Sequence, residues 1–122
     1  MSTDFAYETN FHSNKNFNLI RVFQKKGFEP IIYFLYISSI NKCKERVAKR
    51  VSKGGHFVSD KEIENRYTLG LKHLKKAVSL NFAIFIYDMT DDKQPLPALL
   101  LKNSTIIQNN NCPEVLMQSL DL

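Results

Sequence analysis

The sequence predicts an α/β domain in which helices flank a short, mostly parallel sheet, followed by a C-terminal β-hairpin. Helical periodicities alternate with unbroken apolar runs at 31–37 and 82–87, and these runs are rich in β-branched and aromatic residues. Runs without polar alternation are typical of parallel strands that are buried on both faces. The 122 residues suit a single domain, with a core over 4–90 and a hairpin and short helix over 96–120.

The first part of the chain is expected to form a strand, a helix and a second strand. The short aromatic segment 4–8 (DFAYE) predicts a strand, and apolar residues recur at helical spacing over 15–26. Gly27 is a natural residue to follow that helix. Pro30 then opens the apolar run IIYFLYI. This order predicts a βαβ unit with a right-handed crossover.

Two helices are expected on either side of a glycine turn. Serines can cap a helix over 40–52, and Gly54-Gly55 then lets the chain reverse. Ser59 begins a capping box, Ser-x-x-Glu, for a helix over 60–80. After the second apolar run, the sequence predicts a hairpin that pairs 98–101 with 105–108, and a short helix that starts at Pro113 with proline in its first turn.

Charge and composition narrow the classes of partner. The net charge is +5, and over 15–53 only Glu29 and Glu45 oppose the cations. A basic half predicts an anionic partner, unless the charges are only solvated helix faces. Nucleic acid is the less favoured partner, because no stacking aromatics are interleaved with the lysines. No apolar run is long enough to span a membrane, and Cys43 and Cys112 lack metal-type spacing, which predicts free thiols in a reducing cytoplasm.

The residues that could bind phosphate surround the glycine turn. They are Arg46, Arg50, Arg66, Gly54, Gly55 and His56. Each alone could be an ordinary surface or turn residue, but together they suit a polyanion such as a nucleotide triphosphate. Glu8 at a strand end could hold Mg²⁺ through water, accept a substrate hydroxyl, or simply be solvated. No spacing of histidines, cysteines or carboxylates predicts a direct metal site.

Several motifs in this order resemble the zeta-toxin-like P-loop kinases. They are RVxxRVxxGGHxV at 46–58, IxxRY at 63–67, LxxL at 71–74, FAYET at 5–9 and IFIYD at 84–88. The resemblance covers 5–88 and implies a P-loop NTPase-like three-layer sandwich that uses ATP and Mg²⁺ to phosphorylate a small hydroxyl substrate, in some members a nucleotide sugar. It implies that Arg46, Arg50 and Arg66 are catalytic and face the phosphates. It also implies that Glu8, Thr9 and Asn10 bind the acceptor, and that Gly54, Gly55 and His56 belong to a lid.

The chain departs from that family in two ways. Asn10, Phe11 and His12 replace small hydroxyl residues, Ser59 replaces a proline and His73 an asparagine. None of the four glycines opens the phosphate-binding motif G-x-x-x-x-G-K-[ST]. The chain therefore looks like the C-terminal two-thirds of such a kinase, a remnant or partial enzyme that is inactive alone. The alternatives are an active kinase whose phosphate-binding loop comes from a separate chain, and a non-enzymatic basic module that binds nucleic acid or phosphate.

Overall fold

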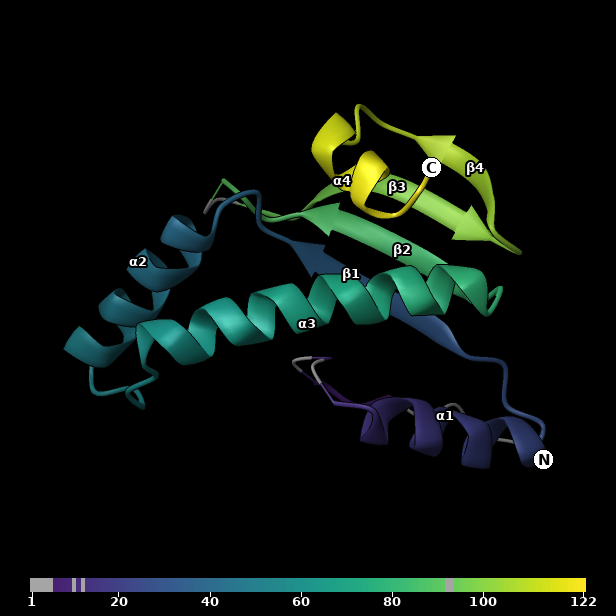
Figure 1. Cartoon of the computed structure of the whole chain (residues 1–122), viewed down its shortest axis with the longest axis horizontal. Coiled ribbons are helices and arrows are strands. Elements are labelled where there is room, and N and C mark those ends of the chain that lie inside the picture. Colours follow the sequence, from purple (N-terminus) through teal and green to yellow (C-terminus); the bar gives the residue numbers. More distant parts are fainter. Residues whose placement is uncertain (1–5, 10, 12, 92–93) are drawn as a thin grey trace.

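The computed structural model describes residues 6–9, 11, 13–91 and 94–122. This part of the chain forms helices and strands close to their predicted positions (Figure 1). In chain order they are α1 (Lys15–Lys25), β1 (Ile31–Tyr36), α2 (Ile40–Ser52), α3 (Asp60–Ser79), β2 (Ala83–Asp88), β3 (Leu96–Lys102), β4 (Thr105–Asn109) and α4 (Glu114–Ser119). The predicted α/β class and the C-terminal hairpin are confirmed. The βαβ unit predicted over 4–37 is not found among the described residues, and the parallel crossover runs instead from β1 through α2 and α3 to β2.

Local sequence signals account for the helix ends. The Ser39 hydroxyl accepts a hydrogen bond from the Lys42 amide, and the Ser59 hydroxyl accepts one from the Glu62 amide, so each serine is a side-chain N-cap. Gly27 follows α1 with a φ of 90°, a conformation that glycine adopts without strain. Pro113 is the N-cap of α4 and not its first residue, one position from the prediction. Among the described residues, no helix is both long and apolar enough to cross a membrane.

The sheet is mostly antiparallel, so the prediction of a mostly parallel sheet is wrong. The strand order is β1-β2-β3-β4, and only the β1/β2 pair is parallel. The chain has residues 89–95 between β2 and β3, which is too short for a parallel crossover of a dozen residues or more. β3 therefore returns antiparallel to β2, and β4 returns along β3.

The strand predicted at 4–8 is not found where the structure can be described. Ala6 to Glu8 are exposed and form no strand, while residues 4 and 5 lie outside the described part. The chain turns inward at Phe11, which is buried against Phe17 of α1 at 5.3 Å between ring centroids. Packing of this aromatic pair replaces strand pairing at the N-terminal end. Among the described strands, β1 is therefore an edge strand.

One face of the sheet carries the core. α1, α3 and α4 all pack on this face, as Figure 1 shows for α3 and α4 in front of the strands. The largest fully buried side chains belong to α3, the strands and α4: Leu74, Ile84, Ile86, Leu101 and Leu116. The helices lie together because the crossover from β1 to β2 covers a single face, and α4 folds back onto that face.

The opposite face has no cover among the described residues. Alternate residues of β1, Ile31, Tyr33 and Leu35, are more than half exposed, although the apolar run predicted burial on both faces. The prediction was wrong because an unbroken apolar run does not reveal whether a second layer of helices is present. The described residues thus form two layers, and the predicted three-layer sandwich is not seen.

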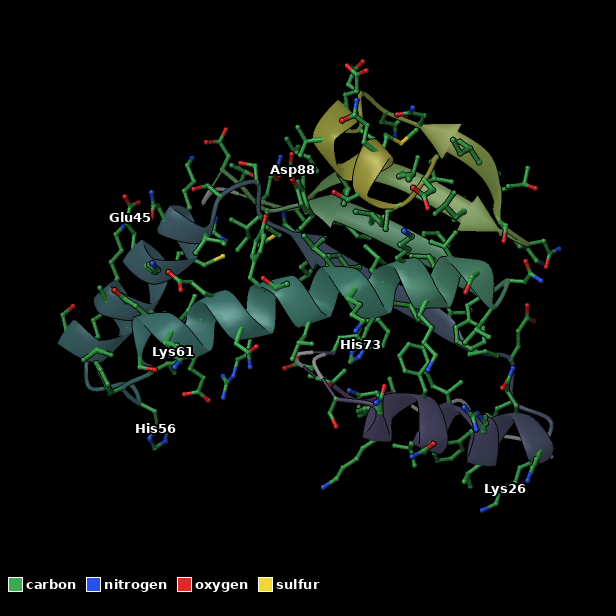
Figure 2. All side chains as sticks on the ribbon, in the orientation of Figure 1. Lys26, Glu45, His56, Lys61, His73 and Asp88 are labelled. Carbon is green, nitrogen blue, oxygen red and sulfur yellow. The ribbon has the colours of Figure 1, made fainter. Side chains whose placement is uncertain are left out.

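A buried histidine, His73, links the N-terminal segment to the core. His73 of α3 is 7% exposed, and its Nδ1 lies 2.8 Å from the Phe11 carbonyl oxygen. The ring meets Phe11 and Phe17 edge-on, at 6.0 and 5.5 Å between centroids. Figure 2 shows His73 directed from α3 toward α1. The tautomer with its proton on Nδ1 satisfies the carbonyl, so this polar pair is buried without an orphaned acceptor.

Candidate functional site

The carboxyl ends of β1 and β2 are joined by hydrogen bonds between the loops that follow them. The Met89 amide donates to the Tyr36 carbonyl at 2.7 Å, and the Ser38 amide donates to the Thr90 hydroxyl at 2.9 Å. The Asp88 carboxylate accepts from the Thr90 amide at 2.8 Å. Ligands of open α/β sheets bind at this edge of a parallel pair. The two loops therefore form an ordered rim where a ligand would be expected.

Two cations of α2 donate hydrogen bonds to this rim and so hold it against the helix. The Arg46 guanidinium donates to the carbonyls of Met89 and Thr90, the latter at 3.3 Å. Lys42, one turn earlier on the same row of α2, donates to the Thr90 carbonyl at 3.4 Å. These contacts hold two positive charges at the carboxyl ends of the parallel strands. Hydrogen bonds from charged donors are about twice as strong as neutral ones, so α2 is fixed here by more than apolar packing.

A shallow hollow of about 190 Å³ lies between α2 and the rim. Its lining residues are Lys42, Glu45, Arg46, Lys49, Thr90 and Asp91. Three cations and two carboxylates give this lining a net formal charge of +1. The hollow is larger than a single water requires and can admit a phosphate group, whose negative charge the three cations would attract. We refer to it as the α2 hollow.

Tyr67 of α3 contacts the rim through its hydroxyl group. Its hydroxyl donates to the Ile37 carbonyl at 2.7 Å, just past the end of β1. Burial raises the pKa of Tyr67, and the neighbouring Tyr36 raises it further. The phenol therefore remains a neutral donor at physiological pH. In the sequence, Tyr67 was noted only within the IxxRY motif at 63–67, and its contact with the strand end was missed.

The structure places one of the three predicted catalytic arginines at the hollow. Arg46 lines it, whereas Arg50 is exposed one turn further along α2 and is not among the lining residues. Arg66 of α3 forms an ion pair with Glu62 at 2.6 Å on the helix surface. An i,i+4 pair of this kind is an ordinary surface interaction. The three arginines do not converge on one point in this structure.

The predicted lid residues lie at the far end of α2. Gly54 has a φ of +91°, and the Gly55 amide donates to the Arg50 carbonyl at 2.7 Å, so both glycines serve the turn itself. A Cβ on Gly55 would lie 2.8 Å from that carbonyl oxygen. Figure 2 shows His56 at this turn, at the opposite end of the helical hairpin from Asp88. The turn is roughly 10 Å along the helix axis from Arg46.

The predicted acceptor residues belong to the segment before α1. Glu8 is exposed, and the Thr9 hydroxyl accepts a hydrogen bond from the Phe11 amide at 3.1 Å, which stabilises the local turn. Asn10 lies outside the described residues. Neither Glu8 nor Thr9 lines the α2 hollow.

Sequence reasoning missed Lys42, Lys49 and Thr90 as members of the site. Lys42 and Lys49 were seen only as part of the general basic charge, although Lys42 precedes Arg46 by one helical turn. Thr90 follows the acidic end of β2, which is a usual position for ligand-binding residues. Within the described ranges, no group of three or more histidines, cysteines or carboxylates could hold a metal ion.

The chain was compared with protein-family models, with curated proteins and with solved structures. None of the three comparisons found a match.

Proposed function

We propose that this chain is a basic α/β domain that binds a phosphorylated ligand in the α2 hollow. One observation carries the proposal: Lys42, Arg46 and Lys49 of a single helix line a hollow at the carboxyl ends of the parallel strands. Phosphate oxygens accept hydrogen bonds from lysine and arginine, and such charge-assisted bonds are the strong ones. The Thr90 hydroxyl lies at the same rim and accepts from Ser38, which orients it.

The resemblance to zeta-toxin-like kinases supports a nucleotide as the ligand. On this proposal the chain is a partial kinase that binds the phosphates of ATP, with Mg²⁺ carried by the nucleotide, and that transfers no phosphoryl group by itself. The sequence supports this view because it lacks the G-x-x-x-x-G-K-[ST] loop. The free thiols of Cys43 and Cys112 are consistent with a cytoplasmic location.

Calorimetric titration tests the proposal directly. Inorganic pyrophosphate and ATP, with and without Mg²⁺, are titrated into the 122-residue chain at low ionic strength, where surface charges are least screened. Lys42→Ala and Lys49→Ala are each expected to weaken binding about two- to fivefold, the usual effect of one exposed charge. Lys72→Ala is the matched control, because this exposed lysine of α3 does not line the hollow.

Two outcomes would contradict the proposal. Equal affinity in the Lys42, Lys49 and Lys72 variants would place the ligand elsewhere. ATP hydrolysis or transfer by the purified chain, lost in Arg66→Ala, would show that the chain is an active kinase despite its missing loop. If a separate chain supplies that loop, turnover appears only when the two chains are mixed.

A second candidate function is the binding of nucleic acid along α2. No residue of this helix is buried, and its cations far outnumber its single carboxylate, Glu45. Such binding would weaken steeply with salt, with a slope set by the number of phosphates contacted. Lys53→Ala and Arg50→Ala, outside the hollow, would then weaken binding as much as Lys42→Ala. Under the favoured proposal they leave pyrophosphate affinity unchanged.

A further inference from the structure

The uncovered face of the sheet, here called the open face, is a continuous apolar surface. Strand register places its members on neighbouring strands: Ile31, Tyr33, Leu35, Phe85, Tyr87 and Leu100. None of these side chains is charged. Tyr33 stacks on Phe85 at 5.0 Å and on Tyr87 at 6.4 Å between centroids. The three aromatic rings therefore pack against one another across β1 and β2 within the single chain.

The open face leaves a sizeable apolar area in contact with water. Ile31, Tyr33 and Leu35 are 51%, 63% and 57% exposed. At about 200 Å² for a large apolar side chain, these three alone leave roughly 340 Å² accessible. The largest apolar patch of an ordinary monomer is about 300–600 Å² and is often functional. With the partly exposed rings of β2 beside it, the open face reaches that range, so it is a candidate for a functional contact surface.

We propose that two copies of this chain pack their open faces together as a two-fold symmetric dimer. A stable interface needs about 800 Å² from each partner. The three β1 residues supply roughly 40% of this area. Phe85, Tyr87, Pro97 and Leu100, with the adjoining backbone, extend the same surface toward β3. The members of the face are uncharged, so two copies of the face match each other in polarity, as a two-fold interface requires.

Pairing face to face is favoured over pairing at the edge strand. Two β1 edges joined in register would extend the sheet but leave Tyr33 and Leu35 in water. Packing of the faces buries them, at the spacing of about 10 Å that is usual for stacked sheets. The net charge of +5 opposes association of two copies, but the six named members of the open face are all uncharged. The proposal goes beyond phosphate binding, since the open face shares no residue with the α2 hollow.

Sedimentation velocity across a wide range of concentrations tests the dimer. The mass of the full chain is expected to rise from 14.2 kDa toward twice that value. Higher salt should strengthen association, because it screens the repulsion between two basic copies and leaves apolar burial intact. Tyr33→Glu and, separately, Leu35→Lys should give monomers, since each places a charge inside the interface. Phe57→Glu is the matched control, because Phe57 is 79% exposed at the turn between α2 and α3.

The variants separate loss of the interface from loss of folding. Positions 33 and 35 are more than half exposed, so both variants should retain the far-ultraviolet circular dichroism of the parent chain. Monomers from both face variants, with a dimer from Phe57→Glu, support the proposal. A parent chain that is monomeric at every concentration overturns it. A dimer that survives Tyr33→Glu and Leu35→Lys also overturns it, because a pairing of β1 edges would tolerate charges on the face.

Discussion

Among the residues that line the α2 hollow, Arg46 is expected to contribute most to the stability of the fold and to ligand affinity. Its guanidinium donates to the carbonyls of Met89 and Thr90 and thereby fastens the loop after β2 to α2. Arg46→Ala removes this fastening and one of the three cations of the hollow. The substitution is therefore expected to lower both the stability of the fold and the affinity for pyrophosphate.

The size of the effect follows from the contacts. A hydrogen bond to a charged group contributes about 1.5–3 kcal/mol, but the Thr90 bond is long at 3.3 Å and the side chain is only half-buried. Both facts lower the total, so we expect a loss of about 2 kcal/mol in the free energy of unfolding. A small domain has only about 5–15 kcal/mol in all. The loss would move the melting temperature down by about 10 °C.

Urea unfolding followed by circular dichroism measures this loss. With a slope near 1.5 kcal/mol per molar urea, the midpoint should fall by somewhat more than 1 M. Arg50→Ala is the matched control, because Arg50 is an exposed arginine of the same helix that does not line the hollow. It should change stability by less than about 0.5 kcal/mol. Equal midpoints for the two variants would refute the reasoning about the fastened loop.

Two further predictions concern the supports of the site. Tyr67→Phe should lose about 1–2 kcal/mol, since the Ile37 carbonyl loses its donor. The pKa of Tyr67 is raised in the folded state, so the unfolded state releases the phenol proton at a lower pH than the folded state does. The parent chain should therefore lose stability above about pH 10, and the Tyr67→Phe variant should lose less. Urea midpoints at about pH 8 and about pH 11 measure this difference. Gly55→Ala should cost about 1–3 kcal/mol in urea unfolding, because its Cβ would lie 2.8 Å from the Arg50 carbonyl oxygen, whereas the exposed neighbour His56→Ala should be near neutral.

The sequence was sufficient for features that depend on neighbouring residues. Serines at 39 and 59 marked helix starts because a cap acts within three residues, and the apolar run at 31–37 marked β1. The direction of β3 was also within reach, since the connection over 89–95 is too short for a parallel crossover. The open face was not, because identical apolar runs occur whether one or both faces of a sheet are covered, and the cover is supplied by distant elements.

The site was predicted in part for the same reason. Spacing of four residues placed Arg46 and Arg50 on related faces of one helix, but it could not say which turn of that helix meets the strand ends. The orientation of α2 is set by its contacts with Thr90 and by the Lys44–Glu64 ion pair to α3, at 2.6 Å. Lys42, Arg46 and Lys49 therefore line the hollow, whereas Arg50, the exposed neighbour of Lys49, does not.

These contacts also limit what a lid could do. Gly54 and His56 follow the end of the same helix that lines the α2 hollow, roughly 10 Å along its axis from Arg46, so moving the helical hairpin as a unit would not bring them to a phosphate there. Arg46 donates hydrogen bonds to the loop after β2. Its guanidinium could therefore turn toward a phosphoryl group in transfer only by breaking those hydrogen bonds. The same guanidinium cannot both keep its hydrogen bonds to the Met89 and Thr90 carbonyls and donate to a phosphoryl group in the transition state. On the proposed function, Lys42 and Lys49 would contact the phosphate while Arg46 keeps its hydrogen bonds to the loop, which corresponds to binding without transfer.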